Sequence, residues 1–316
     1  MSDQYEKFET IGQGRHTVIY EGHDHGPLDR AIAVKELADC EDSRRLKSFL
    51  AEAKFLANLD HEHLLKVFDV DPTSNMVITE LLEGSLDQLI KQQGPMGSDR
   101  VRSVMQQALK ALNYLHKKNI IFGALRPSKL MYSYRGKVRL GSFEKIGDGV
   151  VPRPEFEKYV APETLNVAFG DVGPALDFYC LGFTSLELLL GDRFDDIFPV
   201  MSEDSNMAKV DWLRWHGSED EIPPARKLVP RIADDLAAAL DRMLQKNVSQ
   251  RPQSALEVFS LLQDIDPIPV IDGVEQSIRF GSRKQFSADA KSGDSPVGRA
   301  AANPGQATSG LSLIHI

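Results

Sequence analysis

The chain has 316 residues, of which 42% are hydrophobic and 26% charged, and its formal net charge at pH 7 is -9. This length suits one large domain or two lobes around a sizeable core. The acidic balance argues against a nucleic-acid partner, because proteins that bind nucleic acids or acidic membranes are usually basic. No run of about 18 apolar residues occurs, so the sequence predicts no membrane span within the chain.

The two cysteines, Cys40 and Cys180, do not form a CxxC pattern. This usage favours neither a disulfide framework nor a thiolate metal site, and it is typical of a reducing compartment. The N-terminal residues also lack the apolar core of a signal peptide. A cytoplasmic location is therefore expected.

The first 80 residues are predicted to form strands around one helix. Five short segments rich in β-branched residues are separated by Gly, Asp and Pro: KFETIG, TVIYEGH, RAIAVKEL, LLKVFDV and MVITELL. Between the third and fourth segments, residues 42–59 carry apolar side chains at helical spacing.

From residue 85 the pattern becomes helical. Ser85 is a capping residue for a short helix that stops at Gly94. Residues 175–191 are apolar nearly all round, which predicts a buried central helix. Amphipathic helices are predicted over residues 98–118, 232–246 and 254–265. A β-rich lobe followed by a helical lobe is an α+β arrangement.

The C-terminal part has a different composition. Residues 264–310 are predicted to be an irregular or disordered tail or linker, because most of this segment is rich in Ser, Gly, Ala and Pro. The final residues 311–316, LSLIHI, resemble a translated sequencing adapter, so we interpret them as a scar. In that case the natural chain continues further; the alternative is a genuine hydrophobic C-terminus.

A glycine-rich hairpin lies at residues 11–22, IGQGRHTVIYEG. Glycines let such a hairpin approach phosphates closely, with its N–H groups as donors. Alone, the pattern is more often only a turn. One strand later AIAVK ends at Lys35, and the next helix carries Glu52 near its middle. Each could be simply a solvated charge, but together they strengthen the interpretation of a phosphate site.

Motifs further along the chain complete a resemblance. YVAPE occupies residues 159–163, Arg251 follows in SQRP, and Asp177 begins the predicted buried helix. Over residues 8–263 the chain resembles eukaryotic-like serine/threonine protein kinases. The resemblance implies a bilobal protein-kinase-like fold, with an N-lobe of about 8–80 and a C-lobe of about 85–263. It also implies that Arg251 pairs with Glu163 and that Asp177 holds the backbone of the catalytic loop.

The resemblance also implies a nucleotide site. Lys35 would contact phosphates and pair with Glu52, Thr79 would be the gatekeeper, and Glu80 and Leu82 would offer backbone groups to adenine. The full set of expected nucleotide-binding residues is Ile11, Gly12, Gly14, Ile19, Ala33, Lys35, Glu52, Thr79, Glu80, Leu82 and Met131.

The catalytic loop departs from the family pattern. HRDLKPxN reads here as FGALRPSK, so Ala124 replaces the catalytic base and Lys129 the metal-binding asparagine. Ser142 stands where the family has the metal-binding aspartate of DFG. Phosphoryl transfer depends on magnesium ions held by those two residues. Serine is a poor Mg²⁺ ligand, an ammonium repels the ion, and loss of a base costs about 10²–10⁴-fold.

Other positions agree with this loss. Gly123 replaces the arginine of HRD, Arg126 the catalytic-loop lysine, and Phe156 the threonine that precedes APE. We therefore predict a pseudokinase, a nucleotide-sensing or protein-binding regulatory module with a protein partner. No metal is expected, and ATP binding is expected to be weak and magnesium-independent. Two alternatives stay open: an atypical active serine/threonine kinase that uses Glu144 or Asp148 for metal, and a nucleotide-free interaction scaffold.

Two remaining motifs are interpreted as structural. GHDHG at residues 22–26 brings His23 and His25 together, but it is assigned to a solvated turn because no third ligand has metal-site spacing. Trp212 and Trp215 fit either the core or an exposed partner patch, and the core is favoured.

Overall fold

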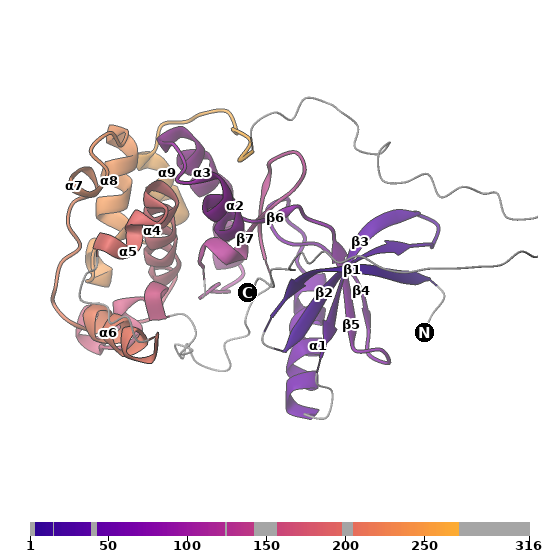
Figure 1. Cartoon of the computed structure of the whole chain (residues 1–316). Helices are drawn as coiled ribbons and strands as arrows, with labels where there is room; N and C mark the ends of the chain where they lie inside the picture. Colours follow the sequence, from indigo (N-terminus) through magenta and orange to yellow (C-terminus); the bar gives the residue numbers. More distant parts are fainter. Residues whose placement is uncertain are drawn as a thin grey trace, which may run out of the picture.

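The computed structural model describes residues 4–14, 16–38, 43–123, 125–141, 157–197 and 205–271. These residues form two lobes, a small β-rich one and a larger helical one (Figure 1). The bilobal α+β architecture expected from the sequence is confirmed. Within the described residues, no helix combines the length and apolar character needed to cross a membrane.

The small lobe is a five-stranded antiparallel sheet with strand order β1-β2-β3-β5-β4. Its elements are β1 (Tyr5–Gln13), β2 (Thr17–Asp24), β3 (Arg30–Leu37), α1 (Ser43–Ala57), β4 (Val67–Asp71) and β5 (Met76–Glu80). Side chains alternate between the two faces of a strand. Val34 and Ile78 therefore fill a core on one face, whereas Leu37 and Val77 pack against Phe49 of α1 on the other.

The larger lobe begins with short strands beneath the connection between the lobes. A three-stranded sheet joins β6 (Gly84–Ser85), β7 (Leu130–Tyr132) and β8 (Val138–Leu140). The helices are α2 (Leu86–Gln93), α3 (Ser98–His116), α4 (Ala175–Leu190), α5 (Arg193–Ile197), α6 (Ser205–Gly217), α7 (Ala225–Leu228), α8 (Asp234–Met243) and α9 (Ala255–Leu261). Five 3-10 turns connect them: η1 (Pro127–Lys129), η2 (Glu157–Tyr159), η3 (Pro162–Thr164), η4 (Val167–Phe169) and η5 (Val248–Gln250).

Local sequence explains where several helices lie. Ser85 caps α2 in a capping box with Gln88, and the helix ends at Gly94, which has a φ of 81°. All 16 residues of α4 are buried, as predicted from its apolar composition. Trp212 is also buried in the core of this lobe, so the favoured interpretation of that tryptophan is confirmed.

The segment after α9 packs back across the larger lobe as far as residue 271. Ser103 of α3 accepts a hydrogen bond from the Ile268 N–H (2.9 Å) and donates one to the Ile268 carbonyl (3.2 Å). Val270 is buried, and its N–H donates to the Gly136 carbonyl in the β7–β8 turn (3.3 Å). The chain therefore leaves the described body beside the small sheet rather than at α9. Residues 272–316, including the suspected scar, lie outside the described residues.

Candidate functional site

The glycine-rich hairpin is the turn between β1 and β2. Gly12 pairs with Ile19 across the two strands. The Gly14 N–H donates to the Thr17 carbonyl (2.7 Å), which closes the turn. A Cβ on Gly14 would lie 2.8 Å from the Thr17 hydroxyl, so only glycine fits without displacing that side chain. Ile11 lies at an irregularity in β1 and is exposed.

The strands bring several expected nucleotide-binding residues to one face of the sheet. Ile19 pairs with Lys35, and Ala33 pairs with Thr79. These side chains alternate with those of the opposite core, so they lie on the face that α1 covers.

Helix α1 lies beside Lys35 on this face. The Lys35 Nζ is 5.6 Å from the ring centroid of the buried Phe49. Glu52 is half-buried and three residues beyond Phe49 in α1, which places the two on the same side of the helix. The structure therefore puts Lys35 and Glu52 in one neighbourhood, while an ion pair between them stays a prediction.

The connection between the lobes begins at the end of β5. The Thr79 hydroxyl, which is almost fully buried, donates to the Glu80 carbonyl (3.2 Å). The Glu80 carboxylate points away from the cleft face, toward the Lys66 N–H (2.9 Å) and the Arg139 Nε (3.1 Å) of β8. Among the described residues, no hydrogen bond engages the Leu82 peptide group.

The catalytic-loop backbone is held by a buried carboxylate. Asp177 at the start of α4 is fully buried and accepts hydrogen bonds from the N–H groups of Phe122 (2.9 Å) and Gly123 (2.7 Å). His116 of α3 contacts the same carboxylate through its Nε2 atom (2.7 Å). Gly123 has a φ of 77°, a conformation that strains any residue with a side chain. Ala124, the next residue in the chain, lies outside the described residues.

One replaced metal-ligand position, Lys129, is tied through its backbone to Gly141. The Gly141 N–H donates to the Lys129 carbonyl (2.7 Å). Ser142 follows Gly141 directly in the chain and lies outside the described residues. Met131, expected against adenine, is half-buried on β7, and its Cγ would lie 3.5 Å from a Cβ on Gly141. Lys129, Met131 and Gly141 are therefore in contact at the ends of β7 and β8.

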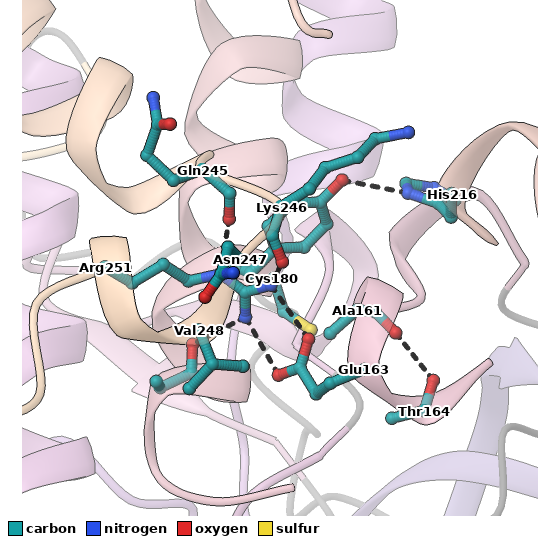
Figure 2. Close-up of polar contacts among 12 residues, drawn as sticks. Ala161, Glu163, Thr164, Cys180, His216, Gln245, Lys246, Asn247, Val248 and Arg251 are labelled. Carbon is teal, nitrogen blue, oxygen red and sulfur yellow. Dashed lines mark hydrogen bonds and ion pairs between the residues drawn. The ribbon is translucent and has the colours of Figure 1, made fainter. Parts of the chain in front are cut away.

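A second buried anchor joins the APE motif to the end of the domain. Figure 2 shows Arg251 reaching Glu163, with two hydrogen bonds of 2.8 Å between the guanidinium and the carboxylate. Both side chains are fully buried. Arg251 also donates to the carbonyls of Gln245 (2.5 Å) and Lys246 (2.7 Å), and its guanidinium carbon lies 4.7 Å from the Tyr179 ring centroid. The Glu163–Arg251 pairing expected from the resemblance is present.

A third contact cluster holds η2, which precedes APE. Lys158 lies between the carboxylates of Glu187 (2.9 Å) and Asp195 (2.8 Å). Burial opposes its charge, but these two carboxylates raise the pKa of Lys158. The Tyr159 hydroxyl donates to Glu187 (2.5 Å). Burial and the adjacent Glu187 carboxylate raise the Tyr159 pKa well above its usual value.

His216 secures the same segment from α6. Its Nε2 atom lies 3.1 Å from the Lys158 carbonyl, and its Nδ1 atom 2.9 Å from the Tyr179 hydroxyl. A carbonyl only accepts hydrogen bonds, so Nε2 carries the proton and Nδ1 accepts from Tyr179. Burial, with the nearby charges of Lys246 and Arg251, lowers the pKa of His216 to about 3 despite the opposing effect of the Lys158 carbonyl.

Sequence reasoning missed several of these positioning residues. His116 lies in a helix that was predicted only as amphipathic. Its partner Asp177 is 61 positions away, so no local pattern indicates their contact. Lys158, Glu187 and His216 were likewise not singled out. Their only sequence signal was a charged or polar residue within an apolar stretch, as Glu187 is in α4.

Comparison with known proteins supports the same architecture. The family description "Protein kinase domain" matches residues 5–261. The chain is 28% identical over 296 residues to the serine/threonine-protein kinase PknK of Mycobacterium tuberculosis, an alignment that covers 86% of this chain and 25% of that protein. It is 27% identical over 326 residues to the serine/threonine-protein kinase PknB of Mycolicibacterium smegmatis, covering 95% of this chain and 50% of that protein. The chain thus corresponds to a quarter to a half of the length of these relatives.

Proposed function

Because this chain belongs to the protein kinase domain family, we propose that it is a pseudokinase, which binds a nucleotide without magnesium-dependent phosphoryl transfer and acts through a protein partner. The observation that carries this proposal is the hydrogen bond between the Gly141 N–H and the Lys129 carbonyl (2.7 Å). It holds Lys129, which stands where the family pattern has its metal-binding asparagine, beside Gly141, the residue that precedes Ser142 in the chain. The half-buried Lys129 therefore brings a positive charge to the position of a metal ligand.

The chemistry of this place disfavours a magnesium ion. Mg²⁺ prefers carboxylates and water in a near-ideal octahedron, whereas Lys129 brings a positive charge and Ser142 a neutral hydroxyl. Phosphoryl transfer relies on metal ions to neutralise the developing charge. With Ala124 at the position of the base as well, three separate contributions to the reaction are missing.

The same cleft keeps features that suit a nucleotide. Lys35 of the small lobe and Arg126 and Lys129 of the larger lobe are half-buried cations, and they would offset phosphate charge without a metal. The Leu82 peptide group, which makes no hydrogen bond within the described residues, would serve the adenine edge. These features favour nucleotide binding over an empty scaffold.

Thermal unfolding of the whole chain with ATP tests the proposal, first in EDTA and then in Mg²⁺. A ligand at about 100 times its Kd adds about 2.7 kcal/mol to the free energy of unfolding, a shift of several degrees in Tm. We expect the shift in EDTA already. A shift that needs Mg²⁺ would favour the atypical kinase, and no shift in either buffer would favour the nucleotide-free scaffold.

Lys35→Met provides the matched variant. Loss of this cation should reduce the ATP-induced shift while Tm without ATP changes little, because Lys35 is only half-buried. Phosphate transfer to a protein substrate that disappears in Lys35→Met would instead establish an active enzyme.

A further inference from the structure

The hairpin between β2 and β3 gathers metal-ligating side chains at its tip. His23, His25 and Asp29 each place one potential ligand atom within 4.8 Å of the others. The His23 Nε2 atom is 2.8 Å from the Asp29 Oδ1 atom, and the two imidazole centroids are 4.9 Å apart. The sequence-based argument that no third ligand was available for His23 and His25 was wrong, because the hairpin folds Asp29 back onto His23.

A fourth donor comes from the neighbouring strand. Glu6 of β1 places its Oε2 atom 3.0 Å from the His25 Nε2 atom. Glu6 also pairs with His23 across the β1–β2 ladder, so the backbone itself fixes this approach. His23, His25 and Asp29 thus lie within reach of one ion, and Glu6 of β1 contacts one of them, His25.

The backbone under these four groups is held firmly. Asp24, which is almost fully buried, accepts hydrogen bonds from Gln4 Nε2 (3.0 Å) and the Gly26 N–H (3.0 Å). The His25 N–H donates to the Gln4 carbonyl (2.8 Å), and the Asp29 N–H to the Gly26 carbonyl (3.0 Å). The turn is therefore shaped by contacts that do not use the four ligand atoms.

We propose that Glu6, His23, His25 and Asp29 bind a divalent transition-metal ion of the zinc class. Imidazole with carboxylate oxygen is a donor set that Zn²⁺ accepts in tetrahedral geometry, at about 2.0–2.2 Å. Donor atoms of such a site are about 3.3 Å apart. The two contacts of 2.8 and 3.0 Å are a few tenths of an ångström shorter than this spacing. The ligand atoms of His23, His25 and Asp29 all lie within 4.8 Å of one another, so small side-chain rotations would bring them onto one ion.

This site is separate from the proposed nucleotide cleft. It lies at the opposite end of β2 from the glycine-rich turn, about 20 Å away at the usual rise of a strand. An ion there would tie β1 to the β2–β3 hairpin and so stabilise the outer edge of the small lobe.

Competition with a chromophoric zinc chelator tests the proposal on the metal-stripped whole chain. We expect one Zn²⁺ per chain from this site and weaker binding as the pH falls, because protons compete for the imidazoles. Asp29→Asn is the sharpest variant, since Asn tolerates the left-handed backbone that Asp29 adopts at a φ of 43°. Asp29→Asn and His25→Gln should each weaken binding at least tenfold, given that even residues behind the ligands are worth about 10–100-fold.

His61→Gln is the matched control, because His61 belongs to the other histidine cluster of the small lobe and stacks on Tyr114. It should leave the zinc affinity unchanged, and the Tm of each metal-free variant verifies folding. Absence of zinc binding in the parent chain would overturn the proposal. So would an affinity that both Asp29→Asn and His25→Gln leave intact, which would locate the ion elsewhere.

Discussion

The buried anchors of the larger lobe and the cleft between the lobes differ in how far they keep the residues of the protein kinase pattern. Glu163, Arg251 and Asp177 are fully buried, and each occupies its family position with the expected contacts. In the cleft, the half-buried Lys129 and Arg126 both depart from that pattern. Among these five residues, the fully buried ones keep the pattern and the half-buried ones depart from it.

The difference has an energetic reason. Removing one member of a buried ion pair leaves a charge without a partner, at a cost of about 3–5 kcal/mol, which is a large part of a domain's stability. Surface substitutions usually change stability by no more than about 0.5 kcal/mol. Stable folding therefore requires the buried anchor residues, whereas the residues at the catalytic positions are required only for phosphoryl transfer. A chain can change its cleft and still fold as a kinase domain.

The largest expected effect comes from breaking the Glu163–Arg251 anchor. Arg251→Met should lower the free energy of unfolding by about 3–5 kcal/mol in urea titrations, because Glu163 then stays charged and buried. The double variant with Glu163→Gln should lose less than the sum of the two single variants. A loss below about 1 kcal/mol in Arg251→Met would contradict the assignment of this pair as an anchor.

The next effect is the pH dependence of His216. Its folded pKa of about 3 lies below the ordinary value of 6.5, so only the unfolded chain gains this proton as the pH falls below 6.5. Stability should therefore decrease between pH 6.5 and 3, with a slope from this group that approaches about 1.4 kcal/mol per pH unit. Carboxylates also change the pH dependence of stability at the acidic end of this range. The test therefore compares the parent chain with His216→Gln, whose free energy of unfolding should fall less steeply from pH 6.5 to 5. Identical slopes would mean that His216 is protonated in the folded chain.

A smaller effect on stability is expected at Gly123, whose N–H donates to the buried Asp177 carboxylate. Its φ of 77° makes Gly123→Ala unfavourable by about 1–2 kcal/mol, measured by chemical unfolding. Gly173→Ala is the control, because an added Cβ there meets no atom within 4 Å and the backbone is not left-handed. Equal costs at the two glycines would show that the loop relaxes around a side chain.

The smallest effect on stability is expected from restoring the family's metal ligands. Lys129→Asn with Ser142→Asp should change the free energy of unfolding by no more than about 0.5 kcal/mol, because the half-buried Lys129 takes no part in the buried anchors. The ATP-induced shift in Tm should, however, become dependent on Mg²⁺. A pair of substitutions that leaves the shift independent of Mg²⁺ would place the nucleotide phosphates away from Lys129.

Local patterns in the sequence were sufficient for the sheet of the small lobe, for α1 to α4, α8 and α9, and for the fold class, but not for β6–β8 or α5–α7. Helical spacing predicted α1, Ser85 predicted the start of α2, and an all-round apolar stretch predicted the buried α4. These signals are short-range, because capping and amphipathic periodicity act within a few residues. Motif spacing also identified the Glu163–Arg251 pair, through resemblance to a family rather than through geometry.

Contacts between distant segments were decided only by the tertiary structure. His116 joins Asp177, His216 reaches the Lys158 carbonyl, and Glu6 meets His25 across two strands. The spacing of these residues in the sequence does not predict their contacts, because the contacts depend on how whole elements pack and on the register of the sheet. The sequence by itself determined most of the elements and the departures from the family's catalytic pattern, and packing decided which polar groups meet.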